Sequence, residues 1–147
     1  MNNFRFINNF LHVENVSIKN LSRTFGTPFY CYSTNSIIQK YKQFEKPFLN
    51  TDIKICYAVK ANPNIAILKI LSKLGCGTEV VSYGELKRSL EAGISNKKIV
   101  FSGVGKTFDE IQYAIKKNIL QINIESIGEL ELIEKIAKKS KKVIQLG

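Results

Sequence analysis

One lysine of this sequence, Lys60, ends an apolar run that reads KICYAVK over residues 54–60. If the run is a β-strand, its side chains alternate between two faces. The face with the lysine holds Cys56, Ala58 and Lys60, and the opposite face holds Ile55, Tyr57 and Val59. Small neighbours leave room for a planar group beneath the amine, and loss of hydration lowers the pKa of a lysine and favours its nucleophilic form. Such an amine suits Schiff-base chemistry with an aldehyde cofactor, although a lysine that simply ends in solvent also fits the run.

A second lysine, Lys106, belongs to the segment FSGVGKT at 101–107, whose last three residues are typical of a phosphate-binding loop. The full pattern, GxxxxGK[ST], requires glycine at position 100, and this sequence has Val100 there. Without the first glycine the backbone cannot wrap a phosphate in the usual way. We therefore expect a glycine-rich turn in which Thr107 caps the following helix.

Few other groups of the sequence suit catalysis or metal binding. The cysteines, Cys31, Cys56 and Cys76, are odd in number and form no CxxC pair, which argues against a disulfide framework and a zinc knuckle. The only histidine, His12, lies near the N-terminus, in a context that favours a surface residue over a catalytic one. We expect no metal site.

The net charge of +10 suggests an acidic partner, but the positive charge is distributed differently from that of a nucleic-acid-binding protein. Nineteen lysines and only three arginines carry it, whereas readout of base edges favours arginine. Lysines cluster at 97–98, 116–117 and 138–142, where helices are expected to end and where cations complement the helix dipole. We expect no nucleic-acid partner. The sequence shows no transmembrane stretch and no secretory signal, so we also expect a cytoplasmic protein without a membrane partner.

A repeating pattern of strands and helices must position these lysines. Short apolar runs, typical of strands, recur at 53–59, 78–81, 98–103, 120–125 and 142–146. Three of them are followed by a capping box, at Ser82–Glu85, Thr107–Glu110 and Ser126–Glu129. After the first run, Asn62 can cap a helix that has Pro63 at its first position.

The stretches between these runs have helical periodicity. One predicted apolar face holds Ile65, Leu68, Ile70 and Leu71, and another holds Phe108, Ile111, Ala114 and Ile115. Gly75, Gly93 and Asn118 stand where helices should end, and all three tolerate the left-handed conformation found there.

Strands that alternate with helices predict a parallel sheet in an α/β fold. An open sheet that binds nucleotides should have a glycine-rich turn after its first strand, and here that turn reads KANPN. The pattern therefore favours a (β/α)8 barrel of the TIM type. Because a complete barrel needs about 250 residues, we expect residues 34–147 to form its first half and the chain to be truncated. Residues 1–33 differ, with strand-like pieces around a short helix, and the helix that leads into the barrel should begin near Ser33 to Ser36.

Four motifs, in this order and spacing, resemble those of the diaminopimelate decarboxylase family. They are YAVKANPN (57–64), LGCGTEVVSYGELKRSLEAG (74–93), IVFSGVGKTFDEI (99–111) and INIESIGELELI (122–133). This family belongs to the pyridoxal-phosphate-dependent decarboxylases with an alanine-racemase-like barrel. The likeness extends over nearly the whole chain, including the lead-in GTPFYCYS.

The resemblance implies that Lys60 is the catalytic residue, which forms the Schiff base with pyridoxal 5′-phosphate. It also implies that Ala58 is a small residue near the cofactor. Glu79 stands where the wider group commonly has an acidic residue close to the active site.

The resemblance further places Ser102 and Gly103 at the mouth of the third strand and Glu125 and Ser126 at that of the fourth. Ser102 is a candidate for cofactor contact. For all four residues, a role in the strand-end turn or in helix capping is an open alternative.

The family also uses groups that we do not find in this chain. These are a histidine that stacks on the cofactor ring, a glycine-rich loop for the phosphate, a glutamate at the pyridine nitrogen and a C-terminal β-domain with a Cys-Glu-Ser motif. Residues 1–33 resemble the segment that joins that β-domain. We therefore expect this chain alone to be inactive.

The resemblance implies a lyase of lysine biosynthesis, which converts the small amino acid meso-2,6-diaminopimelate into L-lysine and CO2 and works as a homodimer. Two alternatives are open at this point. One is a related ornithine or arginine decarboxylase, and the other is a non-catalytic remnant of a degraded or split reading frame.

Overall fold

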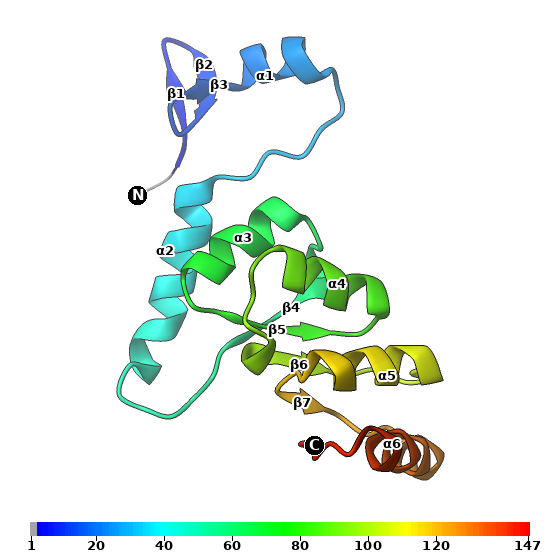
Figure 1. Ribbon diagram of the computed structural model, residues 1–147. Coiled ribbons are helices and arrows are strands. Elements are labelled where there is room, and N and C mark those ends of the chain that lie inside the picture. The colour runs from blue at the N-terminus through cyan, green and yellow to red at the C-terminus, as the bar shows by residue number, and fades with distance from the viewer. Residues whose placement is uncertain (1–2) are drawn as a thin grey trace. The chain divides into compact units, whose positions relative to one another are not determined.

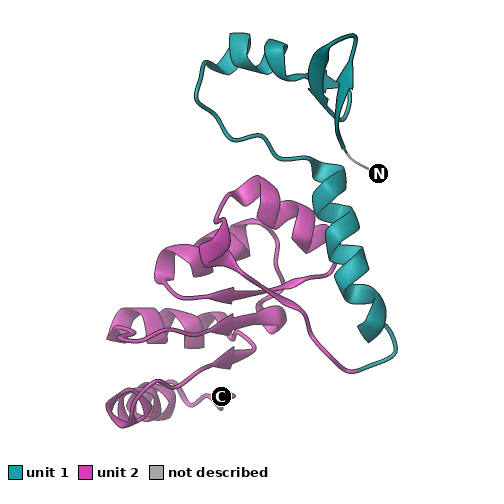
Figure 2. Ribbon diagram, turned by 180° about the vertical axis from the view of Figure 1, so that it is seen from behind, with its two compact units in different colours: residues 1–51 teal, residues 52–147 magenta. Residues whose placement is uncertain are grey.

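The computed structural model describes residues 3–147, in two compact units that comprise Met1–Thr51 and Asp52–Gly147 (Figures 1 and 2). The first unit has a small antiparallel sheet, in the order β1-β2-β3, and two helices. Its elements are β1 (Phe4–Ile7), β2 (Phe10–Val13), β3 (Val16–Ser17), α1 (Ile18–Phe25), α2 (Thr34–Glu45) and the 3-10 turn η1 (Lys46–Phe48). The predicted strands and short helix are therefore confirmed in part, because all three strands precede α1 and no strand follows it before α2.

The helix α2 begins where the sequence predicts. Ser33 is its N-cap, and the Ser33 hydroxyl accepts a hydrogen bond from the Ser36 amide at 3.0 Å. The same hydroxyl donates to the Glu14 carboxylate at 2.7 Å. This carboxylate also accepts from the Asn35 amide. These bonds hold the β2–β3 turn of the first unit against the start of α2, and they lower the pKa of Glu14, first through the Asn35 amide and then through Ser33.

The second unit is a four-stranded parallel sheet in which every strand is followed by a helix (Figure 1). The strands are β4 (Cys56–Ala58), β5 (Gly77–Val80), β6 (Ile99–Phe101) and β7 (Gln121–Ile122), in that spatial order. The helices are α3 (Ile65–Lys73), α4 (Tyr83–Glu91), α5 (Phe108–Lys117) and α6 (Ile127–Ser140), with the 3-10 turns η2 (Val59–Ala61) and η3 (Asn96–Lys98) between elements. This order confirms the predicted succession of β/α units in a parallel sheet.

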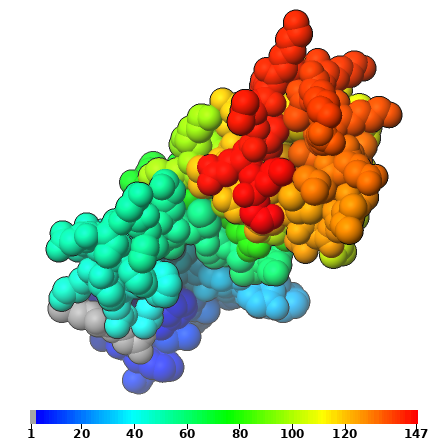
Figure 3. All heavy atoms as spheres, turned by 90° about the horizontal axis from the view of Figure 1, so that it is seen from below, coloured from blue at the N-terminus to red at the C-terminus, as the bar shows by residue number. Residues whose placement is uncertain are grey.

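The fifth predicted strand, at 142–146, is reduced to a single bridge between Ile122 and Leu146. The C-terminal segment lies beside α6 (Figure 3). Its residues Ile144 and Leu146 line a groove together with Leu130 and Ile133 of α6. No helix among residues 3–147 is long and apolar enough to cross a membrane.

The core of the second unit lies between the sheet and its helices. Val80, Phe101 and Ile122 are neighbours in register on this face and are at most 1% exposed. The helices complete the core with their buried residues, Leu68, Leu86, Ile111, Ala114, Ile115, Ile133 and Ile136. Alternation of side chains along each strand therefore leaves the opposite face of the sheet for polar and small residues.

Two predicted helix faces need correction. On α3 the buried residues are Ile67, Leu68 and Leu71, whereas the predicted Ile65 and Ile70 are only half-buried. On α5 the predicted Ile111, Ala114 and Ile115 are buried, but the predicted Phe108, at the first helical position, is 41% exposed.

The helix starts show one correct capping box and two variants. Thr107 and Glu110 form the reciprocal box, while Ser82 and Ser126 each accept from the amide three residues on. The glutamates of these two helices do not bond back to the N-cap amide. The Glu85 carboxylate accepts from the Val81 amide at 2.8 Å, and the Glu129 carboxylate pairs with Lys106.

The prediction that Asn62 caps α3 is wrong. Asn64 is the N-cap, and its side chain accepts from the Ala66 amide at 2.9 Å. Asn62 instead accepts from the Asn64 amide and shapes the turn before the helix. At the other ends, Gly75, Gly93 and Asn118 have positive φ angles of 83°, 84° and 54°, as predicted.

Candidate active site

The carboxyl ends of the four parallel strands meet at one edge of the sheet, where α/β proteins place their functional groups. On the face away from the helices, one register row holds Ala58, Glu79, Val100 and Gln121. Ser102 and Asn123 follow one pleat further toward the carboxyl edge. The sheet therefore brings the predicted Ala58, Glu79 and Ser102 to one face, together with two amides that the prediction did not include.

Lys60 lies at this edge, but it does not belong to the strand as predicted. β4 ends at Ala58, and Lys60 is the middle residue of η2. Val59, fully buried in the core, anchors that turn, while Lys60 itself is exposed. Among residues 3–147 the amine of Lys60 has no hydrogen bond or ion pair. An exposed and unpaired amine is able to react with a carbonyl group.

Glu79 and Cys56 lie deeper on the same face. Glu79 is half-buried and stands in register with Ala58, on the neighbouring strand. Burial raises the pKa of the Cys56 thiol, and the negative charge of Glu79 raises it further. Because the thiolate is the nucleophilic form of cysteine, Cys56 competes poorly with Lys60 for an electrophile.

Ser102 belongs to a polar chain along the carboxyl edge. The side-chain nitrogen of Asn123 donates to the Ser102 hydroxyl at 3.0 Å. The side-chain nitrogen of Gln121 donates to the side-chain oxygen of Asn123 at 2.7 Å. Sequence reasoning missed Gln121 and Asn123, although alternation in LQINIE places them on one face with Glu125. Glu125 contributes differently, because its carboxylate accepts from the Gly103 amide at 2.9 Å.

Lys106, in the loop between β6 and α5, is buried. Its ammonium donates to the Gly103 carbonyl at 2.8 Å, the Asn123 carbonyl at 2.7 Å and the Glu129 carboxylate at 2.6 Å. It also lies 5.7 Å from the centre of the Phe101 ring. An ammonium has three protons to donate, so Lys106 is not free to bind a phosphate. This agrees with the interpretation of the GKT sequence as a structural turn.

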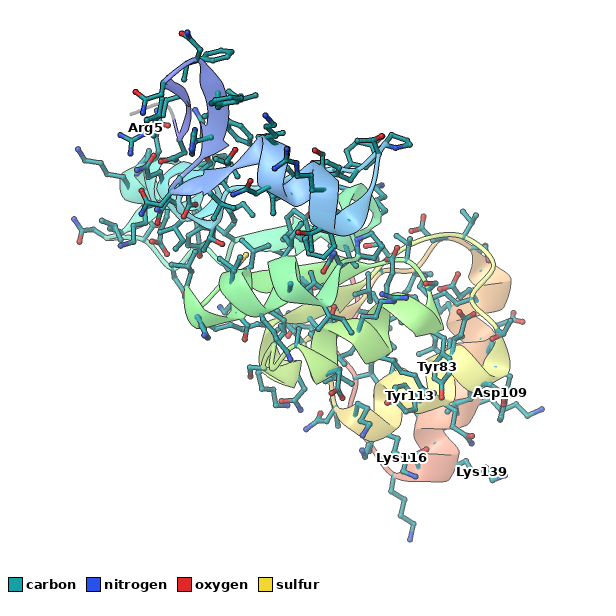
Figure 4. All side chains as sticks on the ribbon, turned by 90° about the horizontal axis from the view of Figure 1, so that it is seen from above. Arg5, Tyr83, Asp109, Tyr113, Lys116 and Lys139 are labelled. Atoms are coloured by element: carbon teal, nitrogen blue, oxygen red, sulfur yellow. The ribbon has the colours of Figure 1, made fainter. Side chains whose placement is uncertain are left out.

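Glu110 links the loops that follow β5 and β6. Its carboxylate accepts from the amide and hydroxyl of Thr107, both at 2.9 Å, and from the Tyr83 amide at 3.0 Å. The Tyr83 ring packs edge-on against Tyr113, with centroids 4.8 Å apart (Figure 4). Burial alone would raise the pKa of Glu110, but the bonds from Thr107 and Tyr83 outweigh it and hold the pKa below its ordinary value.

Replacing Glu110 with glutamine is expected to lower the melting temperature at pH 7 by about 2–5 °C. Since the folded-state pKa lies below the ordinary value of 4.5, the carboxylate stabilises the fold above that pH and loses this contribution as the pH falls through the folded-state value. Thermal unfolding of wild type and variant should therefore converge once the pH falls below the folded-state pKa of Glu110. Glu131→Gln, at an exposed position of α6, is the control. A difference that is unchanged at low pH would contradict the assignment.

The residues at this edge fit an aldehyde cofactor. The fit rests on the unpaired, exposed amine of Lys60, on the small side chain of Ala58 two residues before it, and on the Ser102–Asn123 pair at the same edge. The part of the chain that the structure describes contains no cluster of three or more His, Cys, Asp or Glu side chains suited to a metal ion.

Comparison with known proteins identifies the class. Residues 34–146 match the family described as pyridoxal-dependent decarboxylase, pyridoxal binding domain, and the chain belongs to this family. Among curated relatives, the diaminopimelate decarboxylase of Aquifex aeolicus is 46% identical over 129 residues, which are 88% of this chain and 30% of the relative. That of Haemophilus influenzae is 41% identical over all 147 residues and 35% of its own length.

Solved structures agree with this assignment. The crystal structure of diaminopimelate decarboxylase from M. jannaschii, in complex with L-lysine, superposes with a TM-score of 0.91 at 35% identity and covers 99% of this chain and 35% of that one. A lysine/ornithine decarboxylase from Vibrio vulnificus has a TM-score of 0.76 at 19% identity, covering 88% of this chain and 34% of that one, which shows the shared fold alone. The chain spans about a third of the length of these relatives.

Proposed function

We propose that this chain is the part of a diaminopimelate decarboxylase that carries the cofactor-binding lysine. The whole protein would convert meso-2,6-diaminopimelate into L-lysine and CO2. The observation that carries the proposal is Lys60, an exposed and unpaired amine at the carboxyl edge of a parallel sheet. The relatives at 41% and 46% identity support this substrate, because both are named for it.

In this proposal Lys60 holds pyridoxal 5′-phosphate through its amine. Ala58 leaves space for the planar ring, and Glu79 supplies a carboxylate on the same face, in register with Ala58. The Ser102 hydroxyl, held by Asn123, offers a hydrogen-bonding group at the neighbouring strand end. When bound, the cofactor supplies a ring that accepts the electrons left behind by the departing carboxylate.

The anchoring of Lys60 explains how the chain directs its amine. Val59 is fully buried and Tyr57 packs against the core, so the residues on either side of Ala58 fix the strand end. The exposed side chain of Lys60 then extends from a fixed backbone. We also propose that the whole protein acts in the cytoplasm as a homodimer, as the family resemblance implies.

The test is CO2 release by the full-length protein with added pyridoxal phosphate. We expect kcat/KM for meso-diaminopimelate to exceed that for L-ornithine and L-arginine at least about a hundredfold, because a site that binds the distal carboxylate of meso-diaminopimelate rejects substrates that lack this group. A preference for ornithine or arginine would contradict the proposed substrate but not the cofactor. Absence of turnover on all three would contradict the proposed activity.

A further inference from the structure

The ion pair between Lys106 and Glu129 is buried, with side chains only 2% and 6% exposed. Such a pair adds little net stability compared with apolar residues of the same size, because both ions lose their hydration. Thermodynamic stability alone therefore does not explain why a lysine and a glutamate occupy these positions. Their geometry offers a better explanation.

Lys106 joins its own loop to two later segments of the chain, which lie 17 and 23 residues away in sequence. It lies in the loop between β6 and α5, and it donates to carbonyls just after β6 and just after β7 and to a carboxylate in α6. All three of its protons are used. A displacement of either strand end would leave a buried donor or carbonyl unpaired, which is costly.

The two carbonyls belong to residues at the proposed site. Gly103 directly follows Ser102, and the side chain of Asn123 donates to the Ser102 hydroxyl at 3.0 Å. The backbone amide of Ser102 donates to the Val80 carbonyl, and the backbone amide of Asn123 donates to the Phe101 carbonyl. Each of these bonds crosses to the neighbouring strand. Lys106 therefore fixes the ends of the strands that carry the Ser102–Asn123 pair.

Glu129 departs from the local capping rule. The Ser126 hydroxyl accepts from the Glu129 amide at 3.2 Å, yet the Glu129 carboxylate bonds to Lys106 and does not complete the box. Places where a sequence departs from a local rule are often functional. Here the departure supplies the charge that Lys106 needs.

We propose that Lys106, neutralised by Glu129, is a positioning residue that holds the carboxyl ends of β6 and β7 in place for the bound cofactor. Lys106 does not touch the cofactor and acts through the Ser102–Asn123 pair. The proposal rests on the proposed function only for the identity of the cofactor. The restraint on the strand ends is a property of the fold itself.

The test is the double variant Lys106→Met/Glu129→Leu in the full-length protein. It removes both charges at similar volume but leaves the Gly103 and Asn123 carbonyls without this donor, so the melting temperature should fall by no more than about 10 °C. Without cofactor, hydrogen exchange at the amides of Ser102, Gly103 and Asn123 should be at least about tenfold faster. The dissociation constant for pyridoxal phosphate, measured by absorbance titration, should rise at least about tenfold.

The matched control is Lys138→Met/Glu134→Leu. This pair has the same residue types and the same 2.6 Å separation in α6, but its side chains are 74% and 60% exposed. It should leave both exchange and affinity unchanged. Should the double variant fold poorly, Glu129→Asp decides, since it keeps the charge but shortens the reach, and it should raise exchange and the dissociation constant at least about threefold.

Wild-type exchange at the three amides, or a wild-type dissociation constant in variants that fold, would overturn the positioning role. A wild-type protein that takes up no pyridoxal phosphate would contradict the proposed function instead. The exchange measurement alone then decides whether Lys106 restrains the strand ends.

Discussion

Replacing Lys60 with arginine should reduce the turnover of meso-diaminopimelate by the full-length protein about a thousandfold or more. A guanidinium stays protonated at any physiological pH and cannot act as the nucleophile that takes up the cofactor. Because Lys60 is exposed and unpaired among residues 3–147, the substitution should leave the melting temperature close to that of wild type. The measurement is CO2 release at saturating substrate and cofactor.

Lys69→Arg is the matched control for this experiment. Lys69 is an exposed lysine of α3, in the same β/α unit, and its replacement should leave turnover unchanged. Equal activity of the Lys60 and Lys69 variants would show that the amine at the strand end is not the catalytic group.

The second large effect is expected at Phe101. Its side chain is fully buried on β6, a central strand, and it lies beneath the ammonium of Lys106. Phe101→Ala should lower the free energy of unfolding by about 3–5 kcal/mol, through lost transfer energy and the cavity left behind. Urea unfolding of the variant measures this change.

Val104→Ala is the control for Phe101, since Val104 is 84% exposed in the loop that follows β6. Its effect should stay within about 0.5 kcal/mol. A Phe101 variant as stable as the Val104 variant would contradict the assignment of this sheet face to the core.

Much of the second unit can be predicted from sequence because its signals are local. The alternation of apolar runs with capping hydroxyls at Ser82, Thr107 and Ser126 predicts the order of strands and helices, and each of these hydroxyls does cap a helix. The position of Lys60 after such a run likewise places it at the carboxyl edge. These predictions depend only on neighbouring residues.

The remaining features depend on tertiary contacts. The sequence around Glu129 predicts a capping box, but a buried lysine 23 residues away takes the carboxylate, because leaving that ammonium unpaired would cost more than leaving one helix amide without a side-chain partner. Asn64 caps α3 in place of Asn62, and Pro63, which the sequence predicts at the first helical position, lies in the turn before the helix. The Gln121–Asn123 chain depends on the register of β6 and β7, which no single segment specifies.

The central claim is that Lys60 is the amine that holds pyridoxal phosphate, and borohydride reduction tests it most directly. The full-length protein is incubated with the cofactor, reduced and digested, and the modified peptide is identified by mass spectrometry. We expect the reduced label on Lys60, because its amine is exposed and is unpaired among residues 3–147. A label on Lys54, Lys69 or Lys106, with Lys60 unmodified, would contradict the assignment.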